Sequence, residues 1–262
     1  MDGVTVHERL AGHPGVAEIV LDRAEALNAL NTVMAQRLTQ AWAELASDRQ
    51  VHAIVLCAQG SRAFSVGADL KERNRMSDAE LLRQRPVFRA AFGGLLNMPQ
   101  PVIAAVHGYA LGGGCELALS CDVIVADETA VFGLPEASVG LVPGGGGTQL
   151  AARRLGPGKA AEMIFTGRRY DADEALRIGL ADLLVPAGTA SQAAVDMAGL
   201  MAGNSPTAVK AAKRALRQGA DIGLHAALEV EDAAWRAAAL SADRREGIAA
   251  FNEKRPPQWR GE

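Results

Sequence analysis

Two glutamates beside glycine-rich turns are the residues of this chain best suited to proton transfer. Glu116 closely follows the glycine cluster at residues 112–114, and Glu136 precedes a second glycine run at residues 144–147. Carboxyl groups act as general acids and bases when they are held near a substrate. Each glutamate also has an ordinary explanation, namely complementing a helix dipole or capping a helix at the surface. Because few other candidate catalytic groups stand nearby, the pair favours acid–base chemistry more than either residue does alone.

The glycine cluster at residues 112–114 lies between a predicted strand and a predicted helix. Residues 101–106 are an apolar run typical of a buried strand, and residues 115–120 are typical of a short apolar helix. Adjacent glycines let the backbone bend sharply and let a ligand come close to peptide N–H groups. The N–H groups at the start of a helix have no partner within it, so they suit an oxygen that carries negative charge. The segment therefore predicts a binding site for a negative oxygen beside Glu116.

Motifs for other common chemistries are missing. The sequence has no phosphate-binding P-loop, no Gly-x-Gly-x-x-Gly, no His-Glu-x-x-His and no Gly-x-Ser-x-Gly. Its five histidines stand singly, and His107 follows an apolar strand, where a core or strand-end role is the more common one. We therefore expect no metal site and no serine nucleophile.

The composition is that of a globular protein with one core and an appendage. The chain has 262 residues, of which 49% are hydrophobic and 22% charged, so it can bury a sizeable core. A formal charge of -3 gives no overall field that would attract nucleic acid or an anionic membrane, and no apolar run approaches the roughly 20 residues of a membrane span. Three cysteines without paired spacing suit a reducing compartment, so we expect a cytoplasmic protein.

Strands and helices alternate along most of the chain, which predicts an α/β fold with parallel strands. A hairpin is expected at residues 4–10 and 16–21, and Asn31 or Thr32 is expected to cap a helix that ends near residue 46. The remaining predicted elements are strands at 51–57, 101–106, 121–126 and 183–185, and helices at 77–96, 115–120 and from 144–147 to 155.

The last part of the chain is predicted to be all-helical. Ser205 is a helix cap followed by Pro206, and alanine-rich periodic sequence continues nearly to residue 256. We therefore divide the chain into a core at residues 1–200 and a helical region at residues 201–262. An apolar stripe in this region needs a partner surface, and the pattern favours the chain's own core and another subunit equally. The stripe consists of Leu224, Leu228, Trp235 and Leu240.

Several segments, in this order, resemble the enoyl-CoA hydratase/isomerase, or crotonase, superfamily. They are LDRAEALNAL at 21–30, AFSVGADLKE at 63–72, ALGGGCELALSCD at 110–122, FGLPE at 132–136, PGGGGTQ at 143–149 and FNEKRPPQW at 251–259. The resemblance covers essentially the whole chain. It implies a spiral of ββα units with a C-terminal all-helical trimerisation region, an acyl-CoA substrate, and a homo-oligomer that is a trimer or a dimer of trimers.

The same resemblance assigns roles to the residues singled out above. The backbone N–H groups of Ala68 and Gly113 match the two oxyanion-hole donors, which hold the thioester oxygen as it gains charge. Glu116 matches the residue that activates water at the β-carbon, and Glu136 the one that exchanges a proton at the α-carbon. The implied reaction is the reversible hydration of a trans-2-enoyl-CoA to a 3-hydroxyacyl-CoA in acyl-CoA degradation. It uses no metal or redox cofactor, and coenzyme A enters as part of the substrate.

The resemblance also implies where coenzyme A lies. Its adenine is held by backbone around residues 65–71, and its phosphates or adenine are reached from the C-terminal region, sometimes of a neighbouring subunit. Lys71 and Lys254 are explained equally well as solvated surface lysines. The matching positions are Ser65, Val66, Asp69, Leu70, Lys71, Phe251 and Lys254.

Related reactions stay open at this point. Members of the superfamily that isomerise, decarboxylate or dehalogenate acyl-CoA share the oxyanion hole and vary the acids and bases. Carboxylates at both 116 and 136 favour a hydratase over an isomerase. A module that binds acyl-CoA without turnover is a further alternative. The region at residues 77–96 is expected to form the pocket floor, and its sequence does not indicate which acyl chain length or branching the pocket accepts.

Overall fold

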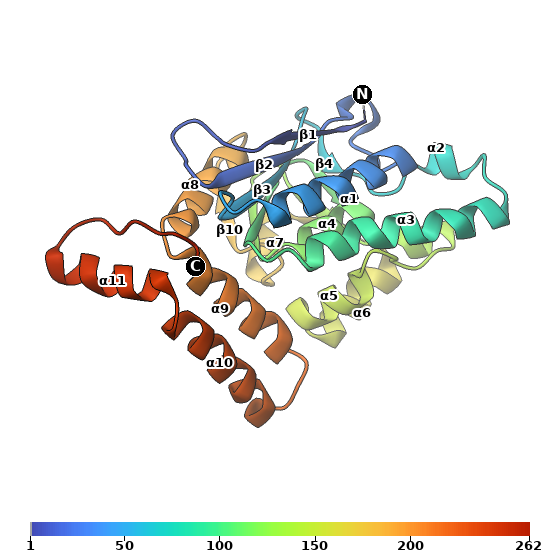
Figure 1. The fold of residues 1–262 in the computed structure, drawn as a ribbon. Helices are drawn as coiled ribbons and strands as arrows, with labels where there is room; N and C mark the ends of the chain where they lie inside the picture. Colours follow the sequence, from blue (N-terminus) through green and yellow to red (C-terminus); the bar gives the residue numbers. More distant parts are fainter. Residues whose placement is uncertain (1) are drawn as a thin grey trace.

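The strands alternate between two sheets in the computed structural model, which describes residues 2–262 (Figure 1). The larger sheet has the order β1-β2-β3-β5-β7-β10. Only β1 and β2 pair antiparallel, as the predicted hairpin requires, and the other neighbours pair parallel. The strands of this sheet are β1 (Val4–His7), β2 (Val16–Leu21), β3 (Ala53–Ala58), β5 (Val102–Val106), β7 (Val123–Asp127) and β10 (Leu183–Val185).

The smaller sheet was not predicted from the sequence. Its strands are only two or three residues long, so none produces an apolar run that stands out as a strand. Each of β3, β5 and β7 is followed by one of its strands and then by helical sequence, which gives repeated ββα units. The smaller sheet has the order β4 (Ala63–Ser65), β6 (Tyr109–Leu111), β8 (Val131–Gly133) and β9 (Tyr170–Asp171).

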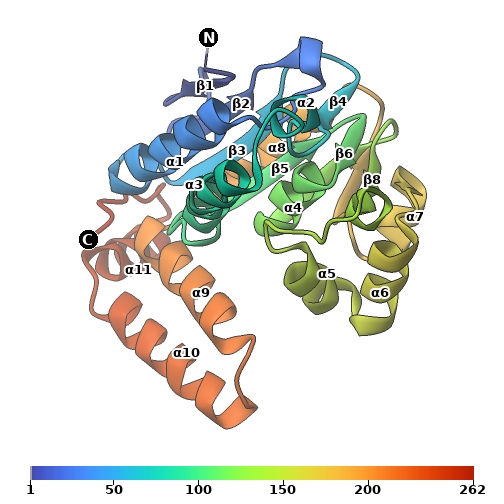
Figure 2. The same cartoon turned by 90° about the vertical axis from the view of Figure 1, so that its right-hand side faces the viewer.

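Helices cover both faces of the larger sheet, because its central strands are apolar on both sides. In β3, Ile54 and Leu56 belong to the main core, whereas Val55 and Cys57 face the helix α8 (Ala190–Ala202). On the main-core side, α1 (Thr32–Ser47) and α3 (Asp78–Leu96) pack against each other (Figures 1 and 2). The remaining core helices are α2 (Leu70–Arg73), α4 (Gly113–Ser120), α5 (Gly147–Leu155), α6 (Pro157–Thr166) and α7 (Ala172–Arg177), with the 3-10 helices η1 (Ala24–Ala26) and η2 (Pro135–Val139).

Local signals explain where the helices that form the site begin. The Asn31 side chain accepts a hydrogen bond from the Met34 N–H, which confirms Asn31 as the cap of α1. Ser77 and Glu80 form a reciprocal capping box at the start of α3, as the prediction at residues 77–96 requires. Helix α4 begins at Gly113, two residues earlier than the prediction at residue 115, so a glycine of the cluster belongs to its first turn.

The chain ends in three helices, α9 (Pro206–Gly219), α10 (Leu224–Ala239) and α11 (Ala242–Glu253). Ser205 caps α9 with Pro206 in the first turn, as predicted. Helices α9 and α10 form a pair that extends away from the sheets (Figures 1 and 2). The predicted boundary after residue 200 falls within α8. The division of the chain into a core and a separate helical region stays a prediction.

The apolar stripe of this region does not pack on the chain's own core. Leu224, Leu228, Trp235 and Leu240 are all exposed. A groove of about 570 Å³ lies between α9 and α10 and is lined almost entirely by alanine, leucine and Trp235. No helix within residues 2–262 is long and apolar enough to cross a membrane.

Candidate active site

A cavity of about 470 Å³ lies where α3, η2, the start of α4 and the segment before α5 meet. Most of its wall is apolar, and four of its residues carry an ionisable side chain. Helix α3 contributes Leu81, Leu82, Arg85, Phe88 and Phe92, which confirms that the region at residues 77–96 lines the pocket. Apolar walls with a few convergent polar groups are typical of small-molecule sites. The four ionisable residues are Arg73, Arg85, Glu116 and Glu136.

Glu116 is held rigidly at the inner end of the cavity. It lies in the first turn of α4 and is only 3% exposed. Its Oε1 accepts hydrogen bonds from the N–H groups of Gly145 at 2.6 Å and Gly147 at 2.7 Å. Burial raises the pKa of Glu116, while these N–H groups and the nearby Arg85 favour the ionised form. The arrangement orients one carboxylate oxygen and leaves Oε2 for another partner.

Glu136 lies in a less polar setting across the same cavity. It is half-buried in η2, and its Oε2 has no hydrogen-bond partner among residues 2–262. Burial raises the pKa of Glu136 to about 7, with a smaller contribution from the charge of Glu116. The two carboxyl groups therefore differ in how readily they are protonated, since two peptide N–H groups bind the Glu116 carboxylate and only its own N–H favours the Glu136 carboxylate.

The two predicted oxyanion donors are brought together by a close backbone approach. Gly67 has φ +81°, and a Cβ built on it would lie 2.6 Å from the Gly113 nitrogen. Only glycine allows this contact between the loop after β4 and the start of α4. Ala68 and Gly113 both line the cavity. Neither of their N–H groups has an acceptor within the described chain, so both are available to a ligand oxygen.

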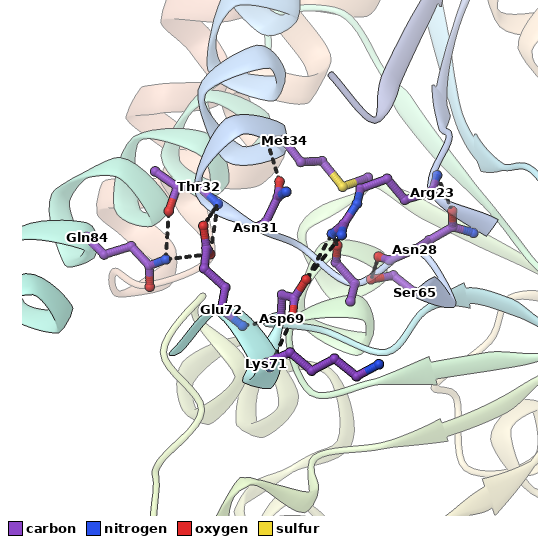
Figure 3. Close-up of polar contacts among 11 residues, drawn as sticks. Arg23, Asn28, Asn31, Thr32, Met34, Ser65, Asp69, Lys71, Glu72 and Gln84 are labelled. Carbon is purple, nitrogen blue, oxygen red and sulfur yellow. Dashed lines mark hydrogen bonds and ion pairs between the residues drawn. The ribbon is translucent and has the colours of Figure 1, made fainter. Parts of the chain in front are cut away.

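The predicted coenzyme A loop at residues 65–71 is ordered by polar contacts (Figure 3). The Ser65 hydroxyl donates to the Asn28 carbonyl at 2.8 Å, and Asp69 caps α2 while it pairs with Arg23 at 3.2 Å. Burial opposes ionisation, but the α2 N–H groups and Arg23 keep the pKa of Asp69 below its usual range. Ser65 and Asp69 thus hold the loop in shape with their side chains.

The other loop residues face open space. Val66 and Leu70 line the cavity, and Lys71 lines a separate hollow of about 360 Å³ with Asn31 and Arg75. Lys71 is exposed and its Nζ contacts no acidic group of residues 2–262. Three of the predicted loop residues therefore line one of the two hollows.

Phe251 and Lys254 are not brought to this cavity within one chain. Phe251 is 84% exposed on α11, and Lys254 caps the end of that helix. The lining of the cavity includes no residue from α9, α10 or α11. Phe251 and Lys254 therefore do not line the cavity of their own chain.

Four functional positions were missed from the sequence. Gly145 and Gly147 were noted only as a glycine run, although their N–H groups bind Glu116. Arg73 was not singled out, and Arg85 was taken only as part of the helix at residues 77–96, although both line the cavity. The spacing of Leu81, Arg85, Phe88 and Phe92 is helical, so Arg85 interrupts an apolar stripe, and that interruption was the available signal.

Known proteins share this fold and these segments. Residues 12–262 match the family Enoyl-CoA hydratase/isomerase. The short-chain-enoyl-CoA hydratase of Clostridium acetobutylicum is 38% identical over 92% of this chain and 92% of its own length. The human mitochondrial methylglutaconyl-CoA hydratase is 38% identical over 95% of this chain and 74% of its own length.

A solved structure matches over nearly the whole chain. The enoyl-CoA hydratase from Bacillus anthracis superposes with a TM-score of 0.95 at 37% identity, covering 99% of this chain and 100% of its own. The agreement confirms the ββα spiral that the resemblance implied. The chain belongs to the enoyl-CoA hydratase/isomerase family and has the crotonase fold.

Proposed function

We propose that this protein is an enoyl-CoA hydratase that adds water reversibly to a trans-2-enoyl-CoA and forms a 3-hydroxyacyl-CoA. The main support for the proposal is that two carboxyl groups line one cavity and differ in their hydrogen bonds and their pKa. Glu116 has two peptide N–H partners, whereas Glu136 has an unpartnered Oε2 and a pKa raised to about 7. Water addition needs one base and one acid at the same time, and such a pair provides both.

In the proposed reaction, the Glu116 carboxylate takes a proton from water as the water oxygen bonds to the β-carbon. Electrons of the double bond move toward the thioester, whose oxygen gains charge. The N–H groups of Ala68 and Gly113 stabilise that oxygen, and one such donor is typically worth about 100- to 1,000-fold in rate. Protonated Glu136 then gives its proton to the α-carbon. The pair carries one proton before and after the addition, on Glu136 at the start and on Glu116 at the end, and proton exchange with solvent restores the starting state.

We propose that no metal or redox cofactor takes part, because the addition of water is redox-neutral and the two carboxyl groups supply both proton transfers. Coenzyme A would extend from the oxyanion site past Val66 and Leu70, with Lys71 and Arg75 at the hollow near its phosphates.

The direct test follows the loss of the conjugated enoyl-thioester absorbance of crotonyl-CoA. We expect Glu116→Gln and Glu136→Gln each to lower kcat by about 100- to 10,000-fold with little change in acyl-CoA binding, since each removes one proton transfer. Glu128→Gln, which changes an acidic residue outside the cavity, is the matched control. Unaltered turnover in both variants would exclude this mechanism.

Two other functions predict different results in the same assay. An isomerase would move the double bond of a 3-enoyl-CoA faster than it hydrates the 2-enoyl isomer. A module without turnover would bind acyl-CoA tightly and leave the absorbance unchanged over several chain lengths. The presence of carboxyl groups at both 116 and 136 supports the hydratase over both.

We further propose that the protein acts as a homo-oligomer, a trimer or a dimer of trimers. The exposed apolar groove between α9 and α10 supports this, and so does the distance of Phe251 and Lys254 from the cavity of their own chain. A neighbouring copy would bring these two residues to bound coenzyme A. The free, buried cysteines are compatible with a reducing compartment, and the cytoplasm remains our proposal.

A further inference from the structure

Two arginines lie in the otherwise apolar wall of the cavity. Arg73 ends α2, and Arg85 takes a position on α3 between Leu81 and Phe88. Neither guanidinium forms an ion pair with an acidic residue of the described chain. A plain alkyl chain offers neither guanidinium a hydrogen-bond acceptor.

Arg73 is held in place by neutral groups. Its Nε donates to the Gln84 Oε1 at 3.1 Å, and its guanidinium lies over the Phe88 ring, 5.0 Å from the centroid. Its neighbour in the chain, Glu72, accepts hydrogen bonds from the Thr32 N–H and the Gln84 amide (Figure 3). Burial lowers the pKa of Arg73, yet an arginine stays charged at any physiological pH. Its Nη groups remain without an acceptor in the described chain.

Arg85 approaches the same space from α3. A Cβ built on Gly144 would lie 3.0 Å from its Nη1, so the guanidinium passes over the loop that holds Glu116. Its charge favours the ionised form of Glu116. Arg85 is exposed and makes no hydrogen bond to a side chain or carbonyl of the described chain, so its donors are free to bind a ligand in the cavity that it lines.

The charges of the cavity do not balance. Two arginines and two glutamates line it, and the raised pKa of Glu136 favours the neutral form of that carboxyl group. An apolar acyl chain that fills the cavity would remove water from the partly buried Arg73 guanidinium without replacing its hydrogen bonds, which is costly. A carboxylate would restore these bonds, and arginine binds carboxylates in a planar, two-bond geometry.

We propose that Arg73 and Arg85 form a subsite for a carboxylate at the far end of the acyl chain, so that the substrate class is the CoA monothioester of an unsaturated dicarboxylic acid. This rests on the proposed function for the reacting end of the substrate. The coenzyme A phosphates are the competing source of negative charge. They are disfavoured because both arginines lie among apolar residues of α3 and η2, whereas Lys71 and Arg75 line the separate hollow.

Binding of unreactive acyl-CoA pairs tests the subsite without depending on hydration. Glutaryl-CoA is compared with pentanoyl-CoA, and adipoyl-CoA with hexanoyl-CoA, by isothermal titration calorimetry on the full-length protein. We expect the carboxylated member of at least one pair to bind about 10- to 100-fold more tightly, as a charge-assisted hydrogen-bonded pair would give. Arg85→Gln and Arg73→Gln should each lower that preference at least several-fold.

Controls separate the subsite from general charge effects. Arg89→Gln removes the same charge from an exposed position of α3 outside the cavity and should keep the full preference. Arg85→Lys keeps the charge without the two-bond geometry and should retain part of it. Circular dichroism of each variant establishes that the fold is intact.

The outcomes are distinct. If the unaltered protein binds both members of both pairs equally well, the subsite is overturned. If the arginine variants lose equal affinity for carboxylated and plain acyl-CoA, the subsite is also overturned, and the arginines are assigned to the coenzyme A phosphates. Kinetics of glutaconyl-CoA against pent-2-enoyl-CoA then tests the proposed function separately. A retained binding preference with hydration of neither compound would contradict the hydratase and leave the subsite standing.

Discussion

Two hollows of the molecule differ in what lines them. The groove between α9 and α10, at about 570 Å³, is larger than the active-site cavity, at about 470 Å³. Its wall contains one ionisable residue, Glu231, whereas the smaller cavity has two glutamates, two arginines and two free peptide N–H groups. Size alone does not locate the chemistry. Convergent polar groups in an apolar wall are typical of a small-molecule site, whereas an exposed apolar groove is typical of a protein contact.

The hollows also differ in how the chain builds them. The groove comes from two consecutive helices, while the cavity joins segments near residues 68, 85, 116, 136 and 145. A change in the groove should therefore alter assembly, and a change in the cavity should alter catalysis. The following predictions test that separation.

The largest effect is expected where two distant segments of the cavity touch. In Gly67→Ala, the new Cβ would lie 2.6 Å from the Gly113 nitrogen, at a φ of +81° that alanine rarely adopts. The two oxyanion donors must then separate, and we expect kcat/KM for crotonyl-CoA to fall by about 100- to 1,000-fold. Gly93→Ala is the control, because a Cβ there meets nothing within 4 Å. Equal activity of the two variants would contradict the assigned donors.

The pH dependence of the rate tests the carboxyl pair. Hydration starts with the proton on Glu136 and dehydration starts with it on Glu116, so both directions need one proton on the pair. Since the pKa of Glu136 is about 7, kcat/KM should fall above pH 7 in both directions, approaching about tenfold per pH unit. Initial rates with crotonyl-CoA and 3-hydroxybutyryl-CoA measure this. A profile that stays flat to about pH 9 would contradict the assignment.

A smaller effect on rate is expected from the groove. Leu216 lines it and is 76% exposed, so Leu216→Glu should leave the fold of the chain intact and place a charge in the proposed subunit contact. Light scattering should give a smaller particle than the unaltered protein. We expect a higher KM, because Phe251 and Lys254 of a neighbour would be lost, with kcat changed less than about threefold. Gln218→Glu, an exposed change on the same helix outside the groove, is the control.

If light scattering shows that the unaltered protein is a monomer at micromolar concentration, the proposal of a homo-oligomer is overturned. If a groove variant dissociates and its kcat falls as far as that of the cavity variants, then catalysis depends on the groove as well as on the cavity.

The smallest effect concerns stability. The folded-state pKa of Glu136 lies above its usual value, so ionisation of this group costs stability as the pH rises through about 7. Glu136→Gln removes that cost. Because the side chain is partly exposed, we expect a gain of only about 1–2 kcal/mol in the free energy of unfolding at about pH 8, relative to about pH 5. Urea unfolding of both proteins measures it, and an equal gain at both pH values would contradict an ionisation effect.

Local signals allowed much of the fold to be predicted. The capping groups Asn31, Ser77 and Ser205 and the apolar runs of the larger sheet all correspond to observed elements. The smaller sheet was missed, because strands such as β4 are defined by hydrogen bonds to distant segments and have too few residues for a pattern.

In the site, too, features with a local sequence pattern were predicted and features that depend on distant segments were missed. Glu116 and Glu136 stood out through their own glycine turns, and both do line the cavity. The partners of Glu116 come from Gly145 and Gly147, about one helix and two strands later, and no local pattern connects them. Arg85 was missed because a charged residue on a helix ordinarily faces water, and only the tertiary contact with the loop at Gly144 places it in the cavity.

The division of labour between the two glutamates is tested most directly by proton exchange at the α-carbon of butyryl-CoA in D₂O, followed by NMR. This exchange needs a base at the α-carbon and the oxyanion donors, and it needs no activated water. We expect Glu116→Gln to exchange within about tenfold of the unaltered protein, and Glu136→Gln to lose about 100-fold or more. Exchange that survives in Glu136→Gln and disappears in Glu116→Gln would contradict the account.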